Sequence, residues 1–313
     1  MLGLLWGEGW SVWRAAKKAR LDKLEVLLAV ELQPNVLVNR KHPVRGLTPL
    51  MATTRAKNTT SVASCVRILI SYGADVNTVD NTKNKNTALH YAASNNKATA
   101  IDVLLNAGAN VFARNADGLT ALDLAWMNGR REASRVLMKR IQLQSGWLDM
   151  SARLSKPRWK RCWCVVLTGD SEDSAQLCVF NEPDQVRPSK MLLFSSSSSA
   201  VIPSWSPFEF HVDGVQAQHL HLRNDIVASV ETRLYSEFVF ATDGWEPPND
   251  RWSWVKALRA SCAFTTGDRR VPRIQRQQLA QSSQRTVRKR SELRLSSPLS
   301  TGRRSLQEES FKD

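Results

Sequence analysis

Apolar residues in the first half of the chain recur at helical spacing between short polar turns. Three related tetrapeptides open such segments, and the second and third begin 33 residues apart: Thr48-Pro49-Leu50-Met51, Thr87-Ala88-Leu89-His90 and Thr120-Ala121-Leu122-Asp123. An apolar residue with an apolar pair three positions on follows the first two, as Val66 with Leu69-Ile70 and Ile101 with Leu104-Leu105. In the third copy the mark weakens to Ser134 with Leu137-Met138. A fixed period of this length predicts stacked helical hairpins.

A glycine turn closes these units, as Tyr72-Gly73-Ala74-Asp75-Val76-Asn77 and again as Ala107-Gly108-Ala109-Asn110-Val111. The three marks keep a common order and together resemble the ankyrin repeat. The resemblance implies two short antiparallel helices and a finger-like turn per unit, with a concave face that holds a protein partner. Ala15-Ala16 and Leu27-Leu28 match the helical part of an earlier, divergent copy. About four repeats are therefore predicted over residues 10–144.

Local chemistry supports these boundaries. A threonine at the head of the first helix can cap it, and Gly73 and Gly108 can end the second helix with a positive φ. The longer first spacing predicts extra residues at 56–62, and the polar run at 80–86 predicts an extended finger. His90 is expected to have a structural role between repeats. Four lysines either make the concave face basic or are ordinary solvated surface: Lys57, Lys83, Lys85 and Lys97.

After Arg140 the pattern changes to short alternating runs separated by turns, which is typical of strands. Seven strands are expected near residues 146–150, 159–167, 177–180, 191–194, 208–212, 219–222 and 238–242. A helix with an apolar stripe that includes Trp254 follows, and Asp250 is placed to cap it. The order predicts a small barrel closed by one helix.

Residues 145–263 resemble a pleckstrin-homology domain through Gly146-Trp147-Leu148, Trp159-Lys160-Arg161 and the helix tryptophan Trp254. The resemblance implies a phosphoinositide site between the first two strands. Its three anchor positions hold Met150, Lys160 and Cys162, so only one is basic. Five basic residues nevertheless cluster there and are the predicted lipid-headgroup ligands: Arg153, Lys156, Arg158, Lys160 and Arg161. Specific phosphoinositide binding, weak attraction to anionic lipid, and a barrel that binds protein all remain open.

Residues 264–313 are rich in Arg, Ser and Gln, a composition that predicts disorder. One basic cluster, a candidate nuclear-localisation, membrane or RNA contact, comprises Arg285, Arg288, Lys289 and Arg290. Ser291 and Ser305 follow arginine-rich runs and are candidate phosphosites, where phosphate would weaken attraction to other phosphates.

The chain has 313 residues and a formal net charge of +15, and the basic excess lies at its two ends. A basic surface favours phosphate-bearing partners. No stretch approaches the roughly 20 apolar residues of a spanning helix, and the five scattered cysteines suggest a reducing compartment. We therefore expect an intracellular, cytoplasmic protein that associates peripherally with membranes, with the nucleus as the alternative.

The predicted architecture is multidomain: an all-α ankyrin solenoid, a seven-stranded barrel capped by a helix, and a disordered basic tail. It indicates an adaptor that holds an unidentified protein on the ankyrin face and anionic lipid on the barrel and tail. The alternative is a nuclear or nucleic-acid-associated scaffold, which is disfavoured because the tail does not interleave aromatic with basic residues. No phosphate-binding glycine loop, nucleophile elbow or paired catalytic carboxylates are evident, so neither enzymatic activity nor a cofactor or metal is expected.

Overall fold

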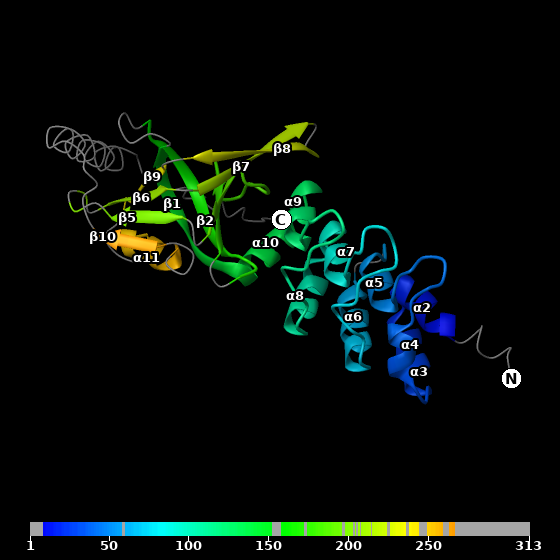
Figure 1. The fold of residues 1–313 in the computed structure, drawn as a ribbon. Helices are drawn as coiled ribbons and strands as arrows, with labels where there is room; N and C mark the ends of the chain where they lie inside the picture. Colours follow the sequence, from blue (N-terminus) through cyan, green and yellow to red (C-terminus); the bar gives the residue numbers. More distant parts are fainter. Residues whose placement is uncertain are drawn as a thin grey trace, which may run out of the picture.

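The computed structural model describes residues 9–57, 60–151, 158–171, 174–195, 198–202, 204, 206, 208–213, 215–223, 226–235, 238–243, 249–258 and 263–266. Helices fill the first part and strands the second (Figure 1). Among the described residues, no helix is long and apolar enough to span a bilayer. The predicted tail lies outside the described residues, apart from 264–266.

Four helix pairs stack side by side in two rows (Figure 1). The first helices of the pairs form one row: α2 (Gly9–Lys17), α5 (Pro49–Thr54), α7 (Ala88–Ser94) and α9 (Ala121–Met127). The second helices form the other: α3 (Leu21–Ala29), α6 (Val62–Ser71), α8 (Ala98–Asn106) and α10 (Arg131–Ile141). A short extra helix, α4 (Pro34–Asn39), follows the first pair. No single pair encloses its apolar face, so stacking creates the core.

The helix ends are formed by the residues that the sequence singles out. Thr48 Oγ1 accepts a hydrogen bond from the Met51 amide at 3.3 Å. Thr120 and Asp123 cap each other's backbone in a reciprocal box. Gly73 and Gly108 have φ of 86° and 84°, in the left-handed region that favours glycine. The extra residues were predicted at 56–62, and the connection between α5 and α6 covers them except Val62, which begins α6.

Polar side chains join successive repeats. Asn39 Nδ2 donates to the Gly73 carbonyl at 2.8 Å, and its Oδ1 accepts from the Asp75 amide at 2.8 Å. Asn77 makes the same pair of bonds one repeat later, to the Gly108 carbonyl and the Asn110 amide. These bonds satisfy backbone groups left free at the ends of the second helices, and they fix the spacing between units.

The fingers are also linked. The Asn81 amide donates to the Gly46 carbonyl at 3.0 Å, and the Ala116 amide donates to the Asn84 carbonyl at 2.8 Å. Gly46 has φ +66°, and a Cβ there would lie 2.8 Å from the Asn81 Cβ. Glycine is therefore needed where these two fingers meet.

The second part is one sheet of described strands in the order β10-β5-β6-β9-β1-β2-β3-β4-β7-β8. Seven neighbouring members curl into a nearly closed antiparallel barrel: β5 (Ser199–Ile202), β6 (Glu209–Asp213), β9 (Phe238–Ala241), β1 (Gln142–Ser151), β2 (Lys160–Thr168), β3 (Ala175–Phe180) and β4 (Lys190–Phe194). The hairpin of β7 (Val215–Arg223) and β8 (Ile226–Tyr235) extends from β4. β10 (Ala263–Thr266) pairs with β5 in parallel.

A seven-stranded barrel was predicted, but one of the strands assigned to it lies outside the barrel. The expected strand at 219–222 belongs to β7, which lies beyond the barrel in the extending hairpin. β5 takes its place and was missed, as were β8 and β10. β5 has only four residues and follows a serine run that reads as a turn, so its strand pattern is too short to stand out.

The barrel interior is filled by apolar side chains from the strands and from α11 (Arg251–Leu258). Asp250 caps this helix, because its carboxylate accepts from the Trp252 amide at 3.0 Å and the Ser253 amide at 3.3 Å. Trp254 of this helix is fully buried. The predicted cap and apolar stripe are thus confirmed.

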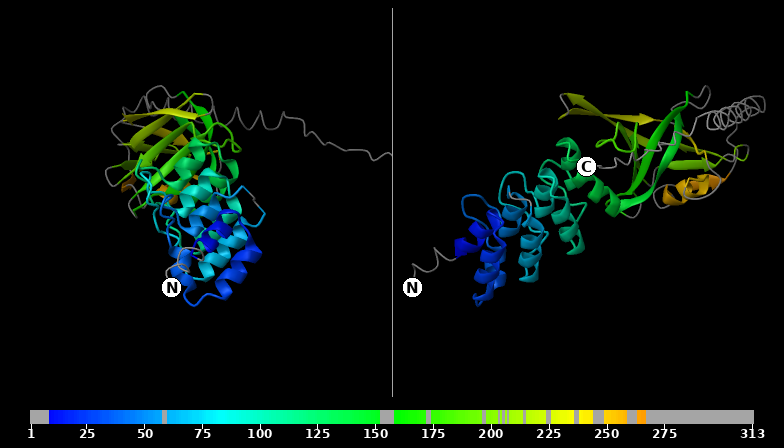
Figure 2. Two further views of the ribbon diagram at one scale, coloured as in Figure 1. Left: turned by 90° about the vertical axis from the view of Figure 1, so that its right-hand side faces the viewer. Right: turned by 180° about the vertical axis from the view of Figure 1, so that it is seen from behind.

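The stack and the barrel lie end to end, and α10 leads directly into β1 (Figure 2). One hydrophobic cluster spans the junction and includes Leu137 of α10 together with Val165 and Phe180 of the barrel wall. Polar contacts support it: Arg131 Nη1 donates to the Asp184 carbonyl at 2.6 Å, and Arg187 Nη2 donates to the Met127 carbonyl at 3.3 Å. The barrel therefore covers the apolar end of the stack, which a terminal repeat otherwise exposes to water.

Candidate functional site

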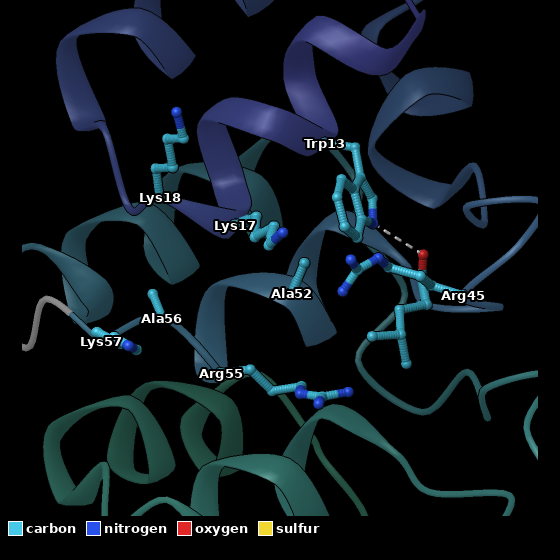
Figure 3. Close-up of a pocket in the computed structure, with 9 residues that line it drawn as sticks. Trp13, Lys17, Lys18, Arg45, Ala52, Arg55, Ala56 and Lys57 are labelled. Carbon is cyan, nitrogen blue, oxygen red and sulfur yellow. Dashed lines mark hydrogen bonds between the residues drawn. The ribbon is translucent and has the colours of Figure 1, made fainter.

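A pocket of about 420 Å³ opens between α2 and α5, on the row of first helices (Figure 3). Hereafter called the basic pocket, it is lined by Trp13, Lys17, Lys18, Arg45, Leu47, Ala52, Arg55, Ala56 and Lys57. Five of these nine residues are cationic and none is acidic. Its volume lies within the usual range of ligand sites, about 300–1,000 Å³.

Trp13 is the fixed element of the basic pocket. Its indole Nε1 donates to the Leu47 carbonyl at 3.1 Å, and only 4% of the residue is exposed. Lys17 Nζ lies 5.6 Å and Arg45 Cζ 5.8 Å from the ring centroid. Figure 3 shows these two side chains beside the indole. Each cation gains a favourable interaction with the ring face, roughly 0.5–1 kcal/mol at an exposed position.

Arg55 connects the pocket to the third helix pair. Its Cζ lies 5.1 Å from the centroid of Tyr91 on α7. The Tyr91 hydroxyl donates to Asp80 Oδ2 at 2.5 Å. Burial, followed by this hydrogen bond, raises the pKa of Tyr91, so the phenol stays protonated and keeps its orientation at neutral pH.

His42 lies beside the basic pocket, and its pKa is lowered there. Its ring centroid lies 4.4 Å from that of Trp13 and 4.9 Å from that of Trp10. Partial burial lowers the pKa of His42, and the positive charges of Arg45, Lys17 and Arg14 lower it further. The imidazole is therefore neutral at pH 7, and lysine and arginine alone supply the charge of the basic pocket.

Comparison with known proteins identifies the helical part. A family model described as ankyrin repeats, in three copies, matches residues 12–115 and 56–145. These matches coincide with the stacked pairs from α2 to α10. Residues 12–145 are ankyrin repeats. The first row of helices and the fingers therefore make up the face that ankyrin repeats use to bind proteins.

Curated proteins are similar to part of this chain. A probable E3 ubiquitin-protein ligase, XBOS34, from Oryza sativa subsp. japonica is 31% identical over 173 residues, 51% of this chain and 31% of the relative. Palmitoyltransferase ZDHHC17 from Homo sapiens is 43% identical over 75 residues, 22% of this chain and 12% of the relative. Ankyrin repeat and SOCS box protein 11 from Homo sapiens is 35% identical over 111 residues, 36% of this chain and 31% of the relative. The match spans less than a third of each relative's length, and the ligase and transferase activities in the first two names are those proteins' own.

Three of the four lysines predicted on the ankyrin face are exposed in the structure. Lys57 lines the basic pocket, and Lys83 and Lys85 are exposed on the finger. The prediction of a surface cation is wrong for Lys97, because this residue is 8% exposed and burial lowers its pKa. Lys17, Arg45 and Arg55 were missed because they lie in different elements, and only the fold brings them together.

His90 has the structural role predicted for it. Its Nδ1 forms the cap of α7 with Thr87, and its Nε2 lies 3.0 Å from the Leu119 carbonyl of the next repeat. Burial lowers the pKa of His90, so the neutral ring serves both contacts.

The structure describes three of the five predicted lipid ligands on the barrel: Arg158, Lys160 and Arg161. Arg158 is exposed, and Lys160 Nζ donates to Asn181 Oδ1 at 2.9 Å. Arg161 is occupied by Asp243 at 2.9 Å and by the ring of Trp147 at 5.2 Å. Arg153 and Lys156 lie outside the described residues.

Two anchor positions of the expected phosphoinositide site are buried in the barrel. Met150 is 8% and Cys162 1% exposed, and both belong to the barrel core. Burial raises the pKa of Cys162, so this side chain behaves as an apolar filler. The tail cluster Arg285, Arg288, Lys289 and Arg290, with Ser291 and Ser305, lies outside the described residues.

Proposed function

We propose that the protein is a non-catalytic adaptor: its ankyrin face holds a partner protein, and its barrel gives weak peripheral contact with anionic membranes. Ankyrin repeats imply protein–protein interaction. The observation that carries the proposal is the open row of first helices, with a cationic pocket at one end and the barrel covering the other. The barrel is packed against the last repeat, so the row of first helices has a fixed orientation relative to it.

The strand order supports the pleckstrin-homology part of the proposal. Strands β1 to β4 follow one another, β5, β6 and β9 complete the barrel, and β9 returns to pair with β1. One helix, α11, closes the interior. On this interpretation β7 and β8 are a hairpin inserted between the last two barrel strands.

The geometry favours electrostatic lipid contact over specific headgroup recognition. Lys160 and Arg158 are the described cations near the barrel opening without an acidic partner, whereas Arg161 is paired with Asp243. Each basic residue near an anionic surface contributes about 1 kcal/mol. Such attraction is weak and falls as salt increases.

The protein-binding part predicts that finger residues decide capture of a partner. In Lys83→Glu/Asp117→Lys the charges of two exposed finger residues are reversed and the net charge is unchanged. Affinity capture with the full chain should lose the partner with this variant. It should keep the partner with Lys23→Glu/Arg67→Glu on the outer helices α3 and α6. Equal capture by all three forms would refute partner binding on this face.

The membrane part predicts that Arg158→Glu/Lys160→Glu weakens sedimentation with phosphatidylserine liposomes at least about tenfold at low salt. Lys23→Glu/Arg67→Glu makes the same change in net charge away from the barrel and should sediment like the parent. Addition of phosphoinositide should change little, because Met150 and Cys162 are buried. Indistinguishable sedimentation of parent and barrel variant on every lipid would contradict membrane contact through these strands.

A further inference from the structure

We propose that the basic pocket binds a carboxylate-rich segment of the partner protein, an inference that rests on the proposed protein-binding function of the ankyrin face. Its cations are Lys17, Lys18, Arg45, Arg55 and Lys57. Among the described residues, none of the five forms a salt bridge with an acidic side chain. They present concentrated positive charge on a face that is otherwise built to receive a protein.

The positive charge of the pocket exceeds what is needed to neutralise the nearby helix C-termini. Lys17 ends α2, and Arg55 directly follows α5. Each helix C-terminus carries about half a negative charge. Two such ends amount to about one negative charge, against five positive side chains. Most of the charge is therefore left for an external anion.

Three of the five cations contact an aromatic ring before any ligand arrives. Trp13 positions Lys17 and Arg45, and Tyr91 positions Arg55. Both rings are themselves fixed by hydrogen bonds, to the Leu47 carbonyl and to Asp80. Long side chains ordinarily lose about 0.5–1.5 kcal/mol each when a ligand immobilises them. Pre-positioning reduces that loss, and carboxylates form strong charge-assisted bonds with such groups.

The lining of the pocket is apolar as well as cationic. Leu47, Ala52 and Ala56 are buried apolar residues that line it between the cations. The methylene groups of glutamate can lie on such a surface while its carboxylate forms charge-assisted bonds with the basic groups. A carboxylate-rich segment can therefore meet both the apolar and the cationic parts of the lining.

The same site is poorly suited to single-stranded nucleic acid. Proteins that bind it stack bases on exposed aromatic faces. Trp13 is only 4% exposed, and its ring is already flanked by Lys17, Arg45 and His42. Tyr91 is covered by Arg55. No ring of the pocket is free to take a base, so the positive charge favours an acidic peptide.

The test uses the full chain and a fluorescein-labelled peptide of alternating Glu and Ala, followed by fluorescence anisotropy. Lys17→Ala/Arg55→Ala removes two exposed cations of the pocket. Lys23→Ala/Arg67→Ala removes two exposed cations of the outer helices and has the same net charge. The pocket variant should bind at least about tenfold more weakly than the parent, and the control should match the parent.

Equal weakening by both variants would overturn the proposal, since it would show attraction to overall charge. An oligothymidylate that binds the pocket more tightly than the peptide would overturn the choice of ligand. Failure of this inference is separable from failure of the proposed function. A captured partner that depends on Lys83 and Asp117 but not on Lys17 and Arg55 refutes the acidic segment alone, whereas indifference to both variants refutes partner binding on the face.

Discussion

Replacing Trp254 by alanine is expected to destabilise the barrel by about 3–5 kcal/mol, the usual cost of truncating a buried large aromatic residue. Trp254 is 0% exposed, and its side chain packs from α11 into the apolar interior of the barrel. Its Nε1 donates to Asn249 Oδ1 at 3.3 Å. Gly146 leaves room for the ring, since a Cβ there would lie 3.3 Å from Trp254 Cζ2. Truncation leaves a cavity and removes the closure of the barrel.

Trp252→Ala is the matched control, because the same residue type on the same helix is 54% exposed. Its effect should stay within about 0.5 kcal/mol. Urea unfolding followed by circular dichroism measures both. Similar losses for the two variants would show that α11 does not close the barrel through Trp254.

Phe180→Ala is expected to cost a similar amount, about 3–5 kcal/mol, but to act on both halves of the molecule. Phe180 is 2% exposed and belongs to the hydrophobic cluster that continues into α10 through Leu137. Weakening this cluster exposes the last ankyrin repeat. Hydrogen exchange should accelerate in α9 and α10 as well as in β2 and β3.

Phe240→Ala provides the comparison. Phe240 is 0% exposed, stacks on Phe210 at 5.0 Å, and belongs to the interior cluster of the barrel. It should lower barrel stability by a comparable amount and leave exchange in α9 unchanged. Identical exchange patterns for the two variants would contradict a core shared across the junction.

The elements found from sequence are those with strong local signals. The cap at Thr48, the glycine at 73 and the periodic apolar pairs such as Leu104-Leu105 act within a few residues. Each predicts its own turn of structure without knowledge of the fold. Repetition then predicts stacking, because a single hairpin leaves its apolar face exposed. This is why the ankyrin half could be predicted closely.

Features that depend on distant partners were not found. β5 is too short to show a period, and its pairing with β6 depends on the closure of the barrel. Asn39 repeats the role of Asn77, and the shared Val-Asn pairs at 38–39 and 76–77 are the signal that could have revealed it. The basic pocket has no sequence signature at all. Its cations lie at and just after the end of α2, on a finger and in the α5–α6 connection, which meet only in the folded stack.

The location of peptide binding tests the central claim most directly. Hydrogen exchange of the full chain, with and without the Glu-Ala peptide, maps it by mass spectrometry. The account predicts protection at the end of α2, along α5 and in the finger at residues 42–47, with the barrel unchanged. Protection confined to the barrel strands or to the outer helices, at saturating peptide, would contradict it.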